Sequence, residues 1–139
     1  MNLSRREALW VGLGGLAAVA TPGAVLAATT EELTNAFTGG AAPGTDGITL
    51  TAPEIAENGN TVPVSVSAPG AVAIMLLATG NPEPAVATFT FGPAAGSQMA
   101  ATRIRLAKTQ DVVALAKMAD GSVKQAQATV KVTIGGCGG

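Results

Sequence analysis

Apolar and polar residues alternate along much of the second half of the chain. Successive side chains of a strand point to opposite faces, so a period of two predicts half-buried β-strands. The apolar positions with this spacing are Val62/Val64/Val66, Phe89/Phe91, Ile104/Leu106 and Ala126/Ala128/Val130/Val132/Ile134. The last of these strands leads directly to a glycine-rich C-terminus.

Two further apolar runs have no such alternation. The run 71–78 lies between the turn residues Pro69-Gly70 and 79–82, and its length favours a buried strand over a helix. The run 112–118 predicts another strand, followed by a hairpin turn at Asp120-Gly121. Pro63 has no N–H to donate, so it predicts an edge strand or a bulge at that point.

About seven short strands separated by glycine and proline predict an all-β fold, an antiparallel β-sandwich of immunoglobulin-like type. With one cysteine in the chain, the disulfide of antibody domains is excluded. A short helix is predicted over residues 30–38, because Thr29 and Glu32 have the spacing of a capping box. Leu33, Ala36 and Phe37 would form its apolar face, packed on the domain or on a partner.

The N-terminal segment has the pattern of an export signal. Arg5-Arg6 precede an apolar stretch from Leu9 to Leu26, which is interrupted by glycines and by Pro22. This arrangement predicts a twin-arginine signal peptide over residues 1–27, cleaved after Ala27, and hence a periplasmic protein with no stable membrane anchor. An uncleaved anchor is the alternative. Residues 28–134 would then form the sandwich domain with its N-terminal helix.

The C-terminal pentapeptide, residues 135–139, places the only cysteine between glycines. Cys137 is flanked by Gly135 and Gly136 before it and by Gly138 and Gly139 after it. Five extended residues span about 17 Å, enough to carry a sulfur atom into a cleft of another protein. The sequence therefore predicts a functional arm, with an idle chain end as the alternative. A prenylation motif is excluded, because it places cysteine fourth from the end and here it is third.

Other candidate chemistry is sparse. The sequence has no histidine, which excludes histidine-based triads, Cys/His pairs and histidine-rich metal sites. Glu54 and Glu57 are the closest pair of carboxylates after the helix, and we interpret them as solvated loop charges. The net charge is −1 without a basic cluster, so no nucleic-acid partner is expected. We expect no catalytic residues, no metal and no cofactor in this chain, and hence no enzyme.

The thiol of Cys137 has no neighbour in the sequence that would activate it. Low cysteine pKa values arise beside helix N-termini or cations, and the nearest lysine, Lys131, lies six residues upstream. The terminal carboxylate is nearer and opposes thiolate formation. We therefore expect activation to come from a partner's site.

Several segments together resemble the SoxY family, the sulfur carriers of the bacterial thiosulfate-oxidising Sox system. The similar segments are the paired arginines, residues 48–63 (ITLTAPEIAENGNTVP), 81–84 (NPEP), 102–120 (TRIRLAKTQDVVALAKMAD) and 130–139 (VKVTIGGCGG). The terminal pentapeptide is the most specific of them.

The resemblance implies an immunoglobulin-like periplasmic protein that forms a heterodimer with SoxZ. It implies that Cys137 carries the substrate covalently and that a swinging arm presents it to transient partners. The haem complex SoxAX would join thiosulfate to the thiol, the manganese-dependent hydrolase SoxB would release sulfate, and a sulfane dehydrogenase would oxidise the remaining sulfur.

Two other functions fit the same C-terminus. Cys137 could form an interchain disulfide in an exported structural or interaction module, as unpaired exported cysteines often do. The terminal Gly138-Gly139 could instead be activated as a thiocarboxylate, but the export signal argues against this because ATP and adenylating enzymes stay in the cytoplasm.

Overall fold

The computed structural model describes residues 28–134 of the 139-residue chain. The predicted signal peptide (1–27) and the predicted carrier arm (135–139) lie outside the described residues. In chain order the elements are α2 (Thr30–Thr38), β1 (Thr49–Thr51), β2 (Ile55–Ala56), β3 (Val62–Ser67), β4 (Ala71–Ala78), β5 (Ala85–Thr90), β6 (Met99–Ile104), β7 (Gln110–Met118) and β8 (Val123–Val132).

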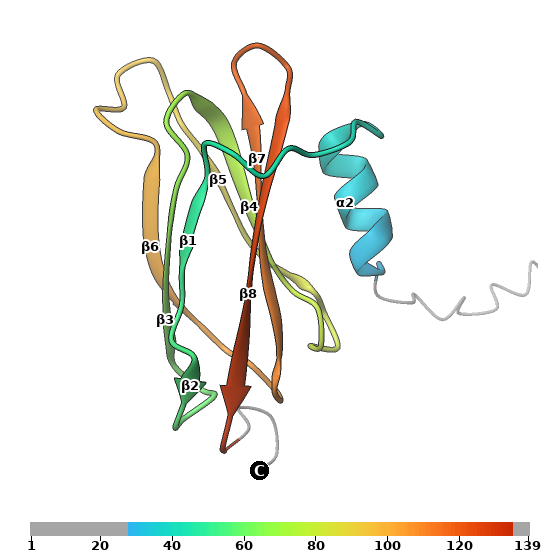
Figure 1. The fold of residues 1–139 in the computed structure, drawn as a ribbon, viewed down its shortest axis with the longest axis vertical. Coiled ribbons are helices and arrows are strands. Elements are labelled where there is room, and N and C mark those ends of the chain that lie inside the picture. The colour runs from blue at the N-terminus through green and yellow to red at the C-terminus, as the bar shows by residue number, and fades with distance from the viewer. Residues whose placement is uncertain (1–27, 135–139) are drawn as a thin grey trace, which may run out of the picture.

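The strands form two sheets packed face to face, as Figure 1 shows. One sheet has the order β1-β3-β6, and the other has the order β2-β8-β7-β4-β5. The predicted β-sandwich is therefore confirmed. Its strand pairs are antiparallel with one exception among the described residues: β2 runs parallel to β8, pairing Ile55 with Lys131 and Ala56 with Val132.

The core lies between the two sheets. Its side chains include the inward-facing apolar residues that the alternation in the sequence predicts. Val62, Val64 and Val66 are all buried, as predicted. Ile104 and Leu106 are buried too, whereas the intervening Arg105 is exposed. Aliphatic side chains of both sheets form one continuous cluster, without a disulfide among the residues described. Burial of this apolar surface is the main stabilising contribution to the fold.

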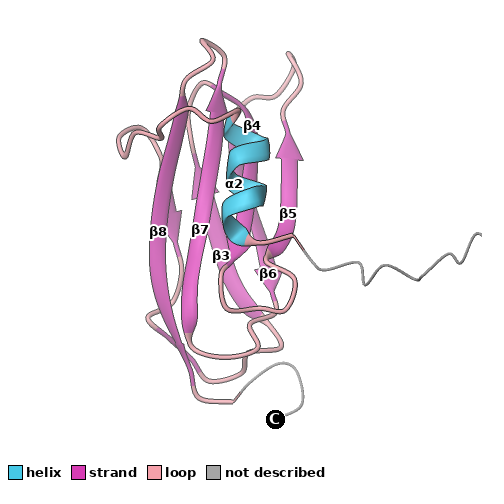
Figure 2. Ribbon diagram, turned by 90° about the vertical axis from the view of Figure 1, so that its right-hand side faces the viewer, coloured by secondary structure: helices cyan, strands magenta, loops and turns pink. Residues whose placement is uncertain are grey.

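The helix α2 covers the outer face of the five-stranded sheet (Figure 2). Its capping box is confirmed, because Thr29 Oγ1 accepts the Glu32 N–H and the Glu32 carboxylate accepts the Thr29 N–H. Leu33 and Phe37 pack on a small buried cluster of Leu77, Val113 and Leu115. The helix thus packs on its own domain.

One position of the predicted apolar helix face is wrong. Ala36 is exposed, because the stripe that meets the sheet is narrow and only Leu33 and Phe37 lie on it. The ammonium of Lys117 lies 5.4 Å from the centre of the Phe37 ring, which adds a cation–π contact at the margin of this interface.

The prediction that Pro63 marks an edge strand or bulge is also wrong, because β3 is the central strand of its sheet and pairs regularly with β6. Pro63 is nevertheless tolerated for the reason that motivated the prediction. The neighbouring strand β1 ends at Thr51, opposite Ser65, so no ladder partner faces Pro63 on that side.

The last strand ends before the alternation in the sequence does. Val130 is fully buried, and Val132 still packs against the core. Ile134, the next residue of the same alternating set, is 62% exposed because β8 ends at Val132 and the chain bends away. Within residues 28–134, no helix has the length and apolar character needed to cross a membrane.

Candidate functional site

The sequence-predicted site residues, Cys137 and the glycines 135, 136, 138 and 139, lie outside the described residues. The structure describes the segment that leads to them, residues 131–134, which we call the arm base. This segment continues β8 at the end of the sandwich where β2 and the turns before β3 and β7 lie (Figure 1). What can be described of the candidate site is therefore how the arm base is attached to the domain.

On one side, the arm base is hydrogen-bonded to the segment 54–59. The Lys131 N–H donates to the Glu54 carbonyl at 2.9 Å, and the Thr133 N–H donates to the Ala56 carbonyl at 3.1 Å. The Gly59 N–H donates to the Ile134 carbonyl at 2.8 Å, so contact extends to the last described residue. The parallel pairing with β2 thus fixes the backbone beyond the end of β8.

On the other side, the arm base contacts Thr109. Its hydroxyl accepts the Val132 N–H at 2.9 Å and donates to the Val132 carbonyl at 3.4 Å. Amide groups of successive residues in a strand point to opposite edges. The N–H groups of residues 131 and 133 therefore face β2, while that of Val132 faces Thr109. The arm base is held on both edges.

The segment 54–59 is itself bonded to the hydrophobic core. The carbonyl of the buried Gly59 accepts the Leu106 N–H at 2.7 Å, and the Leu106 side chain is fully buried. The arm base is therefore linked to the hydrophobic core through two successive backbone hydrogen bonds.

Sequence reasoning missed the role of the segment 54–59, because its side chains do not perform it. Glu54 and Glu57 are exposed, which fits their interpretation as solvated charges, but their backbone carbonyls bind the arm base. The Thr133 hydroxyl donates to the Glu57 carbonyl at 3.1 Å. The local signal that could have located this segment is the Asn58-Gly59 turn pair. No sequence signal marks Thr109.

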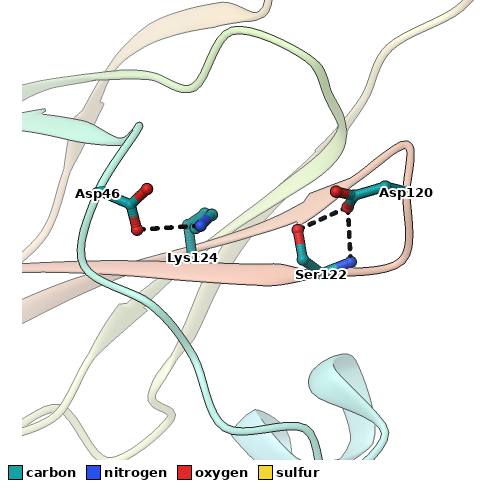
Figure 3. A network of polar contacts seen from close by, with 4 residues as sticks. All are labelled: Asp46, Asp120, Ser122 and Lys124. Atoms are coloured by element: carbon teal, nitrogen blue, oxygen red, sulfur yellow. Dashed lines mark hydrogen bonds and ion pairs between the residues drawn. The ribbon is translucent and has the colours of Figure 1, made fainter.

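The ion pair between Lys124 and Asp46 lies at the opposite end of β8, beside the turn that holds Asp120 and Ser122 (Figure 3). Lys124 donates a hydrogen bond to Asp46 at 3.0 Å, which holds the pKa of that carboxyl below its ordinary value of 3.8. The Ser122 hydroxyl and N–H both donate to Asp120 and lower its pKa in the same way. A third lowered pKa belongs to Glu32, chiefly because the Thr29 N–H donates a hydrogen bond to its carboxylate. None of these groups belongs to the arm base.

Outside the arm base, the described residues offer a groove but no cluster of metal-ligating side chains. Nowhere in residues 28–134 do three Asp, Glu, His or Cys side chains come together to hold a metal ion. An open groove of about 560 Å³ on the three-stranded sheet has a mostly apolar lining, in which Arg103 is the one charged residue. Its lining includes the hydroxyl groups of Thr51, Ser65 and Thr102 but no carboxylate, histidine or cysteine.

Comparison with known proteins gives a family and a fold. The family model described as "Sulfur oxidation protein SoxY" matches residues 34–137. The structure of the sulfur carrier protein SoxY from Chlorobium limicola f thiosulfatophilum is 36% identical and has a TM-score of 0.62, covering 76% of this chain and 100% of its own. No curated protein sequence matches the chain.

More distant structural matches show the fold alone. The superoxide reductase (neelaredoxin) of Ignicoccus hospitalis is 20% identical with a TM-score of 0.55, covering 63% of this chain and 81% of its own. A putative superoxide reductase from Thermotoga maritima is 15% identical with a TM-score of 0.52, covering 61% and 84%. The same sandwich therefore supports different functions, and function has to be argued from the C-terminal end.

Proposed function

The chain belongs to the SoxY family of sulfur oxidation proteins, and from this premise we propose that it is a periplasmic sulfur carrier whose Cys137 thiol holds sulfur intermediates covalently. Its role in sulfur oxidation is that of a carrier: the reactions take place in partner enzymes. The observation that carries the proposal is an arm base fastened on both edges, three residues before the only cysteine of the chain.

A bonded arm base followed by a glycine-rich end is an arrangement that suits a carrier. The bonded segment extends to Ile134, and the five residues after it contain no side chain other than that of Cys137. Glycine adds no Cβ beside the sulfur, so the arm is narrow enough for a deep site. Its span of about 17 Å lets the thiol enter a partner while the domain stays at the partner's surface.

The proposed chemistry proceeds on the sulfur of Cys137. Joining the thiolate to thiosulfate forms one S–S bond and releases two electrons, which the haem complex SoxAX would accept. Hydrolysis by SoxB would add water, release sulfate and two protons, and leave one sulfur atom on Cys137 as a persulfide. A sulfane dehydrogenase would oxidise that remaining sulfur.

Activation of the thiol is assigned to these partners. A cation close to the sulfur would lower its pKa, and Lys131 is the only lysine or arginine in residues 131–139. An inactive thiol in transit is an advantage for a carrier, because the thiolate is the form that reacts with stray disulfides and oxidants.

Location and assembly complete the proposal. The paired arginines Arg5-Arg6 and the apolar stretch after them support export by the twin-arginine pathway. We assign residues 1–27 to the signal, 28–134 to the carrier domain and 135–139 to the arm. SoxZ is the proposed permanent partner, and SoxAX, SoxB and a sulfane dehydrogenase are transient ones.

The decisive variant is Cys137→Ser. When the purified protein with its SoxZ partner is incubated with thiosulfate and SoxAX, wild type should gain one thiosulfate-derived mass and the variant none. The substitution should leave the midpoint of unfolding unchanged, because position 137 lies outside residues 28–134, in which the buried clusters are found. Loading of the Cys137→Ser variant at the wild-type level would contradict the proposal.

The alternative, an interaction module joined by Cys137 disulfides, makes a different prediction. Its working form would be a disulfide-linked pair of chains, so the protein would migrate as a stable dimer in nonreducing electrophoresis. A carrier would show the dimer as a minor species that reductant removes.

A further inference from the structure

The side chain of Thr109 bonds to Val132 on the edge of β8 that faces β7, beyond the point where the β7–β8 ladder ends. We propose that Thr109 is a positioning residue of the carrier: it holds the last residue of β8 in the extended conformation that precedes the C-terminal residues 133–139. The inference rests on the proposed function, because an exit direction matters only for a chain that delivers Cys137 to a partner.

The need for such a residue follows from the strand register. The ladder between β7 and β8 ends with the pair Gln110 and Val130. Two residues later, the N–H and carbonyl of Val132 face the same edge, where β7 no longer supplies a backbone partner. The Thr109 hydroxyl bonds to both groups, at 2.9 and 3.4 Å, as a paired strand residue would.

The loop that carries Thr109 is itself fixed by Gln110. This side chain is only 7% exposed, and its amide nitrogen donates to the Lys108 carbonyl at 3.0 Å and to Asn81 Oδ1 at 2.8 Å. Its amide oxygen accepts the Gly80 N–H at 2.9 Å. Buried amide groups that are fully bonded in this way rigidify the segment they join.

Asn81 fastens the preceding part of the loop. Its side-chain amide donates to the Arg105 carbonyl at 2.7 Å, and its oxygen accepts the Ala107 N–H at 2.9 Å. Asn81 begins the NPEP segment, to which the sequence resemblance assigns no role. In the structure, Asn81 holds the loop from which Thr109 reaches Val132.

Stability of the domain does not explain Thr109. Its side chain is exposed, both of its hydrogen bonds are exposed, and it belongs to neither buried cluster. Surface groups of this kind contribute little to the free energy of unfolding. Its hydroxyl instead fixes the orientation of the backbone at Val132, five residues before Cys137.

The test compares Thr109→Val, which removes the hydroxyl while keeping the shape, with Thr109→Ser, which keeps the hydroxyl. For thiosulfate loading by SoxAX, we expect Thr109→Val to lower kcat about threefold to tenfold, the loss set by one or two exposed hydrogen bonds. KM should change little, because the surface that docks is the same. Thr109→Ser should load like wild type.

Two further readouts separate positioning from a general effect. A nitroxide attached to Cys137, the only cysteine, should give a narrower, more mobile spectrum in Thr109→Val than in wild type or Thr109→Ser. Reaction of the free thiol with a small aromatic disulfide should proceed equally fast in all three proteins, because that reagent requires no direction of approach.

Equal kcat and equal nitroxide spectra in wild type and Thr109→Val would overturn the inference, as would an equal loss in Thr109→Ser. If wild type itself takes up no sulfur from thiosulfate, the proposed function fails. The nitroxide comparison then still decides whether Thr109 orients the arm base.

Discussion

The two ends of β8 are fixed by different kinds of contact. At its start, Lys124 forms an ion pair with Asp46, whose side chain is 85% exposed, and the adjoining turn is closed by Asp120 and Ser122 (Figure 3). At its end, the arm base is held by backbone hydrogen bonds and by the neutral hydroxyls of Thr109 and Thr133. The start of β8 is held in part by an exposed ion pair, whereas the contacts of the arm base given above are made by neutral groups.

This difference indicates that the attachment of the arm base is kept constant when solution conditions change. Exposed ion pairs are weakened by salt and by protonation, and they contribute little to stability. Hydrogen bonds between backbone groups do not titrate, and those of the arm base connect through Leu106 to the core. The attachment of the arm should therefore be insensitive to pH and ionic strength over the range in which the domain is folded.

The largest effect is expected for a substitution at the arm end that disturbs the loop carrying Thr109. A Cβ at Gly80 would lie 2.9 Å from the Gln110 Cβ and 3.2 Å from Lys108 Cε, closer than packed side chains approach. Gly80→Ala should lower the free energy of unfolding in urea by about 1–3 kcal/mol, the usual range for overpacking. It should also accelerate amide exchange at Val132, because the loop that supports it shifts.

Gly92→Ala is the matched control, because a Cβ there has no atom within 4 Å and the residue is exposed. It should change the free energy of unfolding by less than about 0.5 kcal/mol. If the two variants are equally stable, or if Gly80→Ala destabilises without any change at Val132, the loop does not support the arm base as described.

A smaller effect is expected from acid, and within β8 we expect it at the start of the strand. Because the folded-state pKa values of Asp46 and Asp120 lie below the ordinary 3.8, their stabilisation is fully present above that pH. It is lost as the pH falls below 3.8 and through the lowered values. Amide protection of Gln125, which bonds to Gly44 beside the ion pair, should fall in this range before that of Val132.

Lys124→Met sharpens the test. Without the ammonium, the Asp46 pKa should return towards its ordinary value, and the acid-dependent loss at Gln125 should shrink while Val132 is unaffected. A parallel loss of protection at Gln125 and Val132, in wild type and variant alike, would show that the two ends of β8 are not held independently.

The fold could be predicted from sequence wherever the physical signal is local. The alternation of Val62, Val64 and Val66 reports burial on one face, and the capping box at Thr29 reports a helix start, so both were found. The strands β1 and β2 have three and two residues, too few for any period to be recognised. The placement of Pro63 failed for a related reason, since it depended on where β1 ends.

The candidate site divides in the same way. Cys137 and its glycines are recognised from residue type alone, and their role stays a prediction because they lie outside the described residues. The arm base could not be predicted, since it depends on the parallel pairing of β2 with β8, on backbone bonds from residues 54–59, and on a hydroxyl 23 positions before Val132. Backbone carbonyls are present at every residue and leave no mark in the sequence.

The central claim, that sulfur travels on Cys137, is tested most directly by the intact mass of the protein isolated from cells oxidising thiosulfate, measured with and without reductant. We expect chains that are not disulfide-linked to one another and that carry sulfur-containing additions. Reductant should remove these additions, and they should map to the peptide containing Cys137. An unmodified thiol throughout, or a chain linked permanently to a second copy through Cys137, would contradict it.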